Sequence, residues 1–286
     1  MTSRETTFTF GPPDGKQQVG IIHHPEEGAV NVGLLIVVGG PQYRIGAHRQ
    51  YVHLARYCAD QGIPVMRFDY QGVGDSGGSY PGFENVAGDI HGAIEEFLRQ
   101  VPGIQSVALW GLCEGASALL LGGADHPAVS RVILANPWVQ SESGLAKAYV
   151  KHYYLDRLKN PDFWRKIFSG RLDIITAVKG FLSNIRRAFG GKAANRTLRE
   201  EDNRPFPDRM LSGLKSFPGR TLLIMSQNDL VAREFDDLVS ADRDWKNTLR
   251  DRGTDRIDIT GSDHTFSTEN WRRAAAAATS TWLLSR

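Results

Sequence analysis

The stretch "ALWGLCEGASALLL" (residues 108–121) places one cysteine between two glycines, where an apolar strand-like run passes into a helix-like run. A cysteine in an apolar stretch is usually a small core residue with an inert sulfur. Here the pattern G-x-C-x-G between a strand and a helix has the spacing of a nucleophile elbow, with cysteine where serine is usual. Small residues two positions before and after the nucleophile let strand and helix approach closely around a strained turn. The pattern favours a reactive Cys113 over a core cysteine.

Short apolar runs alternate with helical patterns on both sides of this motif, which is typical of βαβ units and a mostly parallel sheet. We expect strands at "VGLLIVVGG" (32–40), "IPVMRFDY" (63–70), "SVALWG" (106–111), "RVILANPWV" (131–139), "RTLLIMSQND" (220–229) and "RIDIT" (256–260). We expect helices at 46–62, 83–101 and 270–284, and also directly after 113 and after 229. The expected fold class is therefore α/β, with a mostly parallel central sheet flanked by helices.

No strand-like run occurs between 137 and 217, where only helical patterns such as "RLDIITAVKGFLSNIRRAF" (171–189) are found. We therefore expect a helical cap or lid insertion at 137–217, between core segments 1–136 and 218–286. Residues 138–217 hold 16 Lys and Arg against 8 Asp and Glu, a net charge of +8. The rest of the chain holds 18 basic and 24 acidic residues, so charge is segregated although the total is only +2.

The composition is that of an ordinary globular enzyme or binding protein, with 286 residues of which 41% are hydrophobic. Two cysteines, Cys58 and Cys113, are too few for a disulfide framework. We see no signal peptide in the N-terminal sequence and no run of about 18 apolar residues, so we expect a cytoplasmic protein without a membrane span. No nucleic-acid recognition motif accompanies the basic insertion. We expect no metal or other cofactor.

Several segments resemble those of the α/β-hydrolase superfamily. "FDYQGVGDSGGS" (68–79) resembles its D-x-x-G-x-G-x-S segment, and "VVGGP" (37–41) resembles its H-G-x-P oxyanion loop, with Val38 where histidine is common. The combination "GGPQYRIGAHRQ", "MRFDYQGVGDS", "LWGLCEGAS" and "DHTFS" is more similar still to the exosortase A system-associated hydrolases of type 1. Those proteins occur with exopolysaccharide systems and also have cysteine at the elbow. The resemblance implies the α/β-hydrolase fold and no particular substrate.

The superfamily order of nucleophile, acid and histidine points to the two partners of Cys113. Asp229 ends a strand-like run, so its carboxylate is expected at the catalytic edge of the sheet, although an aspartate there is also a common helix N-cap. His264 follows the last predicted strand, where the triad histidine is expected, and the adjacent Asp263 is expected to be a turn residue. In a triad, His264 accepts the thiol proton and Asp229 orients the ring.

A tetrahedral intermediate also needs two backbone donors for its oxyanion. One is the N–H of Glu114, directly after the nucleophile. The other is expected in the loop at 39–42, where Pro41 has no N–H, so that Gly40 is preferred with Gln42 as the second choice. Gln42, Tyr43 and Arg44 follow this loop and are candidates for substrate binding, although a solvated helix start is an equally good interpretation.

Cysteine at this position also bears on the reaction. An acyl-cysteine is a thioester, which forms more readily from another thioester or an activated ester than from an amide. This favours a hydrolase acting on a small-molecule acyl ester or thioester, which a carrier could present. Two alternatives remain: an acyltransferase, since polyester synthases place cysteine at such an elbow, and a non-catalytic scaffold for binding. Competent residues at all three triad positions argue against the scaffold.

The basic insertion gives a testable expectation. As a lid, it would only cover the site with an apolar stripe; as a recognition surface, it would attract an anionic carrier, a phosphate-bearing substrate or an anionic membrane. If it recruits an anion, Arg186→Glu with Arg187→Glu raises KM for an anionic carrier-bound substrate and leaves a small neutral ester unaffected. Added salt should weaken the first effect, because exposed charges are screened over about 10 Å at 0.1 M. Equal KM changes for both substrates would leave only the lid.

Overall fold

The computed structural model describes residues 4–12, 14, 16–26, 28, 30–139, 202 and 204–285. The chain divides into two compact units, Met1–Val139 with Asn203–Arg286, and Gln140–Asp202. All elements below belong to the first unit. Most of the predicted insertion, including Arg186 and Arg187, lies outside the described residues.

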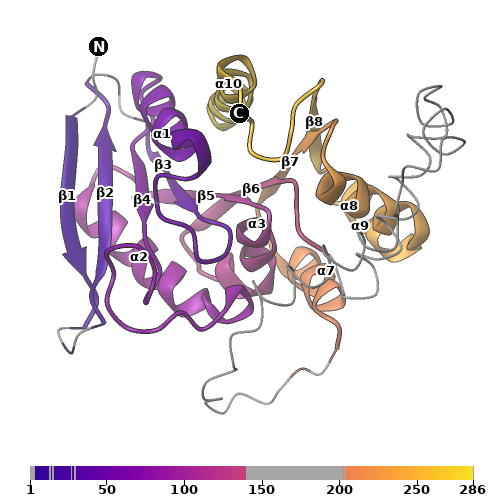
Figure 1. Ribbon diagram of the computed structural model, residues 1–286, viewed down its shortest axis with the longest axis horizontal. Helices are drawn as coiled ribbons and strands as arrows, with labels where there is room; N and C mark the ends of the chain where they lie inside the picture. Colours follow the sequence, from indigo (N-terminus) through magenta and orange to yellow (C-terminus); the bar gives the residue numbers. More distant parts are fainter. Residues whose placement is uncertain are drawn as a thin grey trace, which may run out of the picture. The chain divides into compact units, whose positions relative to one another are not determined.

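An eight-stranded sheet forms the centre of the first unit (Figure 1), in the order β1-β2-β4-β3-β5-β6-β7-β8. The strands β1 and β2 pair antiparallel, as do β2 and β4, and every later pairing is parallel. Their bounds are β1 Arg4–Phe10, β2 Gln18–His24, β3 Val32–Val37, β4 Val65–Phe68, β5 Ser106–Leu112, β6 Val129–Ala135, β7 Arg220–Ser226 and β8 Asp255–Ile259. The expected α/β class with a mostly parallel sheet is confirmed.

The sequence analysis missed the hairpin of β1 and β2. The edge strand β1 pairs only with β2 and exposes most of its side chains, with Phe10 its one buried residue. A strand that is exposed on both faces lacks the continuous apolar run by which the buried parallel strands were found. The hairpin extends the sheet beyond β4 and does not reach the end of β5.

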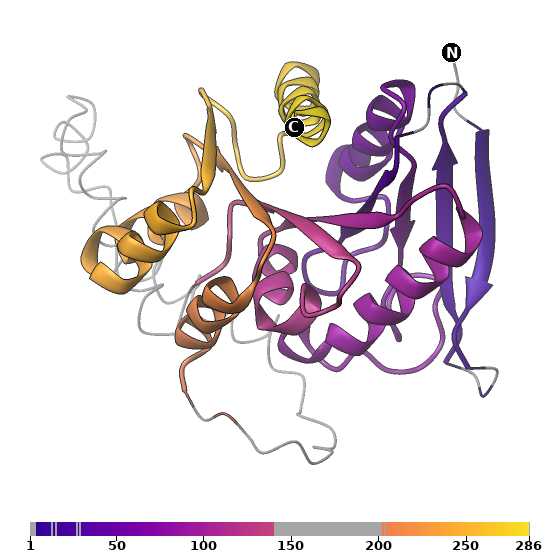
Figure 2. The ribbon, with the colours of Figure 1, turned by 180° about the vertical axis from the view of Figure 1, so that it is seen from behind.

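Helices cover both faces of the sheet (Figures 1 and 2). Two of them, α1 (Gln50–Asp60) and α10 (Glu269–Leu284), lie side by side on one face, and α2 (Ala87–Gln100), α3 (Glu114–Ala118) and α7 (Phe206–Ser216) lie on the other. A π-helical turn, Leu119–Gly123, continues α3. The helices α8 (Leu230–Ala241) and α9 (Arg243–Asp251) connect β7 to β8.

Helix α7 lies within the range predicted as the insertion but belongs to the sheet unit. Its residues Met210, Leu211 and Leu214 are buried in the same core as the strands. It packs against the π-helical turn after α3, where a side chain on Gly213 would collide with the carbonyl oxygen of Leu120. The core therefore resumes before 218, the boundary predicted from the sequence.

The strand order reverses between β3 and β5, and this reversal decides where a site can form. The chain runs from β3 outward to β4, then crosses back to β5 on the other side of β3. In open parallel sheets, ligands bind at such a switch point, at the carboxyl ends of the strands. The loop after β3 and the elbow after β5 both lie at this point.

Two kinds of feature are absent from the described residues. None of the helices in this part of the chain is long and apolar enough to span a bilayer. No group of three or more His, Cys, Asp or Glu in it is arranged to hold a metal ion.

The elbow glycines give a stability prediction. A Cβ on Gly115 would lie 2.6 Å from the carbonyl oxygen of Val37 and 2.9 Å from that of Val38, both of them main-chain atoms that cannot turn aside. We expect Gly115→Ala to lower the free energy of unfolding by about 1–3 kcal/mol, the usual cost of overpacking. The matched control is Gly88→Ala in α2, where a Cβ meets nothing within 4 Å and helix propensity should add about 0.5–1 kcal/mol. Urea unfolding of both variants measures this, and a Gly115→Ala as stable as wild type would contradict the predicted contact.

Candidate active site

Cys113 occupies a turn of one residue between β5, which ends at Leu112, and α3, which begins at Glu114. Its backbone has φ 58° and ψ −124°, a strained conformation for a residue with a side chain. A Cβ on Gly111 would lie 2.6 Å from the main-chain nitrogen of Ala116, so strand and helix touch through the glycine positions. The turn holds the Cys113 side chain, which is partly exposed, at the carboxyl edge of the sheet.

Asp229 and His264 meet at the same edge. The Nδ1 atom of His264 lies 2.7 Å from Oδ2 of Asp229, and Asp229 is only 6% exposed. The same carboxylate accepts the N–H groups of Val231 at 3.1 Å and Ala232 at 3.3 Å, which caps α8. The catalytic and the capping interpretations of Asp229 therefore describe one side chain, because capping fixes the carboxylate that orients the ring.

The charge state of His264 follows from its surroundings. Burial alone would lower its pKa, but the hydrogen bond to Asp229 with the charge of that carboxylate, and the interaction with Cys113, raise the pKa to about 10. The imidazole is therefore held protonated between a carboxylate and the sulfur at neutral pH. This arrangement suits a thiolate–imidazolium pair.

Asn136, a residue that the sequence analysis did not select, fastens the histidine loop. It is fully buried with φ 42°, and its side-chain amide donates to the carbonyl oxygen of His264 at 3.1 Å and to Oγ of Ser226 at 2.9 Å. Its own Oδ1 accepts the N–H of Ser226 at 2.8 Å. The sequence feature that could have indicated this role is a polar residue directly before a proline, at the end of the buried strand β6. Asp263 does close a turn, as expected, by accepting the N–H of Ser267 at 2.9 Å.

The loop after β3 lies directly against the elbow. A Cβ on Gly39 would be 2.6 Å from the carbonyl oxygen of Leu112 and 3.4 Å from the nitrogen of Gly115. Gly40 has φ 62°, and the N–H of Gln42 donates to the carbonyl oxygen of Gly40 at 2.8 Å, which removes Gln42 as an oxyanion donor. Within the described chain, we find no hydrogen bond from the N–H of Gly40 or of Glu114. Both predicted donors remain available.

Side chains from β4 and the segment after it hold this loop in place. The hydroxyl of Tyr70 donates to the carbonyl oxygen of Val38 at 3.0 Å. Beyond the glycines, Asp69 accepts the N–H of Arg44 at 2.7 Å, and Arg67 donates to the carbonyl oxygen of Arg44 at 3.0 Å. The loop is therefore fixed at both ends by groups that are themselves buried.

The surroundings of Arg44 differ from those expected of a substrate-binding residue. It is 8% exposed, and its guanidinium is paired with Asp69 and, at 2.8 Å, with Asp75. A cation with two carboxylate partners fixes the loop, and its remaining Nε is buried without a hydrogen-bond partner among the described residues. Tyr43 is 37% exposed, and its hydroxyl also donates to Asp75. Gln42 is exposed beside the loop, so its binding role stays a prediction.

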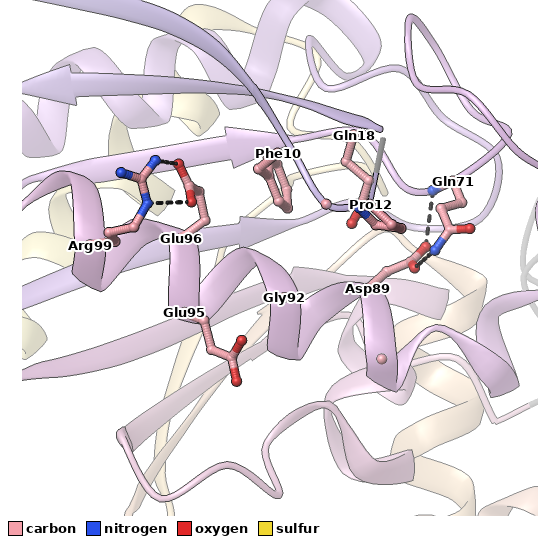
Figure 3. A pocket seen from close by; sticks show the side chains of 11 residues that line it. Phe10, Pro12, Gln18, Gln71, Asp89, Gly92, Glu95, Glu96 and Arg99 are labelled. Atoms are coloured by element: carbon pink, nitrogen blue, oxygen red, sulfur yellow. Dashed lines mark hydrogen bonds and ion pairs between the residues drawn. The ribbon is translucent and has the colours of Figure 1, made fainter. Parts of the chain in front are cut away.

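A cavity of about 520 Å³ lies away from these residues, between the hairpin end and α2 (Figure 3). Several of the polar groups that line it form hydrogen bonds or ion pairs with one another. Both carboxylate oxygens of Asp89 accept from Gln71, at 2.7 and 2.9 Å, and Glu96 pairs with Arg99. Its lining includes none of the predicted site residues.

Solved structures share this arrangement of sheet and helices. An esterase of Pyrococcus furiosus, Pf2001, superposes with a TM-score of 0.66 at 12% identity, over 98% of this chain and 90% of that one. XC6422 of Xanthomonas campestris, described as an α/β serine hydrolase without a lid, gives 0.56 at 16% identity, over 100% and 98%. This chain has the α/β-hydrolase fold. An acylaminoacyl peptidase of Pyrococcus horikoshii also has it, with a TM-score of 0.60 at 16% identity, where 99% of this chain matches 42% of that one.

At the sequence level, a family model described as "Serine aminopeptidase, S33" matches residues 42–163. That range includes the elbow, where this chain has Cys113. A search of curated proteins finds no matching sequence.

The coupling of His264 to Asp229 is open to a direct test. Asp229→Asn removes the negative charge beside the ring, so the pKa of His264 should fall from about 10 toward or below its ordinary value of 6.5. The raised pKa stabilises the folded state fully below pH 6.5 and loses that effect as the pH rises through 10. Ring-carbon NMR titration measures the first effect, and unfolding at several pH values measures the second. An unchanged pKa in Asp229→Asn would remove Asp229 from the site.

Proposed function

We propose that this protein is a hydrolase of esters or thioesters that works through an acyl-cysteine intermediate on Cys113. The observation that carries the proposal is the meeting of three groups at one edge of the sheet. Cys113 stands on a strained one-residue turn, its interaction with His264 helps to raise the pKa of the ring, and Oδ2 of Asp229 lies 2.7 Å from Nδ1 of that ring. The esterases among proteins of this fold support the reaction class. The relation to exosortase-associated hydrolases remains a prediction.

The geometry gives each residue a part in acylation. The Cys113 sulfur attacks the carbonyl carbon, and the carbonyl oxygen takes the electron pair and is bound by the N–H groups of Gly40 and Glu114. When the intermediate collapses, the bond from carbon to the leaving oxygen or sulfur breaks, and the His264 imidazolium gives its proton to the leaving group. Asp229 stabilises the imidazolium and holds the ring in the tautomer that presents Nε2 to sulfur.

Deacylation uses the same groups in reverse. His264, now neutral, accepts a proton from water as the water oxygen attacks the thioester carbon. The C–S bond then breaks, the acid is released, and the thiolate is regenerated beside the imidazolium. A thiolate leaves more readily than an amine. The tetrahedral intermediate formed from an amide would therefore expel the Cys113 thiolate and return to substrate in preference to forming the thioester. This favours thioesters and activated esters over peptides.

The second cysteine of the chain, Cys58, is a matched control for the assignment of Cys113 as the nucleophile. Cys58 in α1 is fully buried, and burial raises its pKa, so its thiol is unreactive. We expect Cys113→Ala to lower kcat toward an aryl ester and an acyl thioester on the order of 10⁴-fold or more, as loss of a nucleophile does. Cys58→Ala should retain kcat and its sensitivity to iodoacetamide.

The result that would sink the proposal is a Cys113→Ala protein with wild-type kcat, or a Cys58→Ala protein without activity although folded. A wild-type protein that transfers the acyl group to an added alcohol or amine in preference to water would keep Cys113 as nucleophile and replace hydrolysis by transfer. A folded wild-type protein that neither turns over nor is acylated by any of these substrates would indicate a binding scaffold.

A further inference from the structure

Glu114 brings a carboxyl group to the place where the proposed oxyanion forms. Its main-chain N–H is one of the two expected donors, and its side chain lies against Gly40, which carries the other. A Cβ added to Gly40 would collide with Oε2 of Glu114 and lie 3.6 Å from its Cδ. The carboxyl group is therefore positioned by the loop and the elbow together.

Among the described residues, this carboxyl group has no cationic partner. Three buried carboxylates of this unit are bonded, Asp69 to Arg44, Asp89 to Gln71 and Asp229 to His264, whereas the buried Glu234 has one carboxylate oxygen without a hydrogen-bond partner among the described residues. The structure gives Glu114 neither an ion pair nor a hydrogen bond from its side chain within the described residues. Burial raises its pKa, with no cation to oppose the effect.

The charge of this group decides whether it helps or hinders the reaction. Two negative charges about 4 Å apart repel each other by about 4 kcal/mol near a protein surface. An ionised Glu114 would therefore oppose the oxyanion, whereas a neutral carboxylic acid has an O–H to donate. A carboxylic acid kept neutral by its surroundings serves as an oxyanion donor in other enzymes.

We propose that Glu114 is a catalytic residue whose carboxyl group, in its protonated form, donates its O–H to the substrate's carbonyl oxygen as that oxygen becomes negative. This inference rests on the proposed function, because it assigns a third donor to the same intermediate. It also predicts that activity falls as the pH rises through the pKa of Glu114, because the carboxyl group then loses its proton while the Cys113–His264 pair is still intact.

Within the part of the chain that the structure describes, the groups that face Glu114 from neighbouring elements form no ion pair with it. Tyr70 and Tyr80 follow β4 and are neutral, with pKa values that burial raises above the ordinary range. Glu84 in the turn packed against α3 is paired with Arg209. Cys113 is adjacent, and its interaction with His264 contributes to the raised pKa of the ring. The ionisation of Glu114 therefore adds a negative charge at the loop that no ion pair of the described residues offsets.

The test compares Glu114→Gln, which keeps an N–H donor without ionising, with Glu114→Ala, which has none. We expect Glu114→Ala to lower kcat by roughly 10²-fold with little change in KM, the usual effect of losing one oxyanion donor. Glu114→Gln should recover most of that loss, and its kcat should no longer fall at the pH where Glu114 ionises in the wild type. The control is Glu95→Gln, an exposed carboxyl on α2, which should leave kcat and the pH profile unchanged.

A second readout does not depend on turnover. The carbonyl stretch of a protonated carboxyl group should be present in the infrared difference spectrum between wild type and Glu114→Gln at neutral pH, and absent between wild type and Glu95→Gln. Wild-type kcat and pH dependence in Glu114→Ala would overturn the inference and leave the Cys113 mechanism standing. An ionised Glu114 in the infrared spectrum at neutral pH would overturn it as well. If instead Cys113→Ala retains activity, the proposed function fails and the catalytic role of Glu114 fails with it.

Discussion

The site depends on a contact between main-chain segments at the switch point of the sheet. The loop after β3 lies against the elbow after β5 so closely that no side chain fits at 39, 111 or 115. This contact brings Gly40 and Glu114, the two predicted oxyanion donors, close together, because a Cβ on Gly40 would collide with the Glu114 carboxyl group. Because both segments follow neighbouring parallel strands, the register of β3 and β5 sets their distance. The catalytic edge is therefore a consequence of sheet topology, with glycine as the means of close approach.

Polar side chains then hold in place the loop after β3 and the loop that carries His264. Asp69, Arg67 and Tyr70 hold the oxyanion loop from β4, and Asn136 holds the histidine loop from β6. Both anchors are buried, where a hydrogen bond is costly to break because its partners would be left unsatisfied. In the proposed reaction, a loop held in this way would present its donors before substrate arrives, which lowers the reorganisation needed in the transition state.

The sequence was informative wherever local pattern and chain order coincide. Cys113 and Asp229 each follow a buried apolar run, and His264 follows the last strand, β8, most of whose side chains are exposed. Parallel strands bring their carboxyl ends to one edge, so the shared position of the three residues could be predicted without coordinates. The structural role of Arg44 could not be predicted, because its burial depends on Asp69 and Asp75, 25 and 31 residues away. From the sequence alone, an arginine in a polar segment resembles a surface residue. The role of Asn136 depends on pairing across two further strands. The strand β1 is exposed at an edge, so its pattern carries no apolar signal.

The most direct test of the account is the intact mass of the protein after a short pulse with acyl thioesters and aryl esters, quenched in acid. The account predicts a mass increase equal to one acyl group, located on Cys113 by peptide mapping, absent in Cys113→Ala and sensitive to hydroxylamine as a thioester is. An acyl group on any other side chain, with turnover retained in Cys113→Ala, would contradict it.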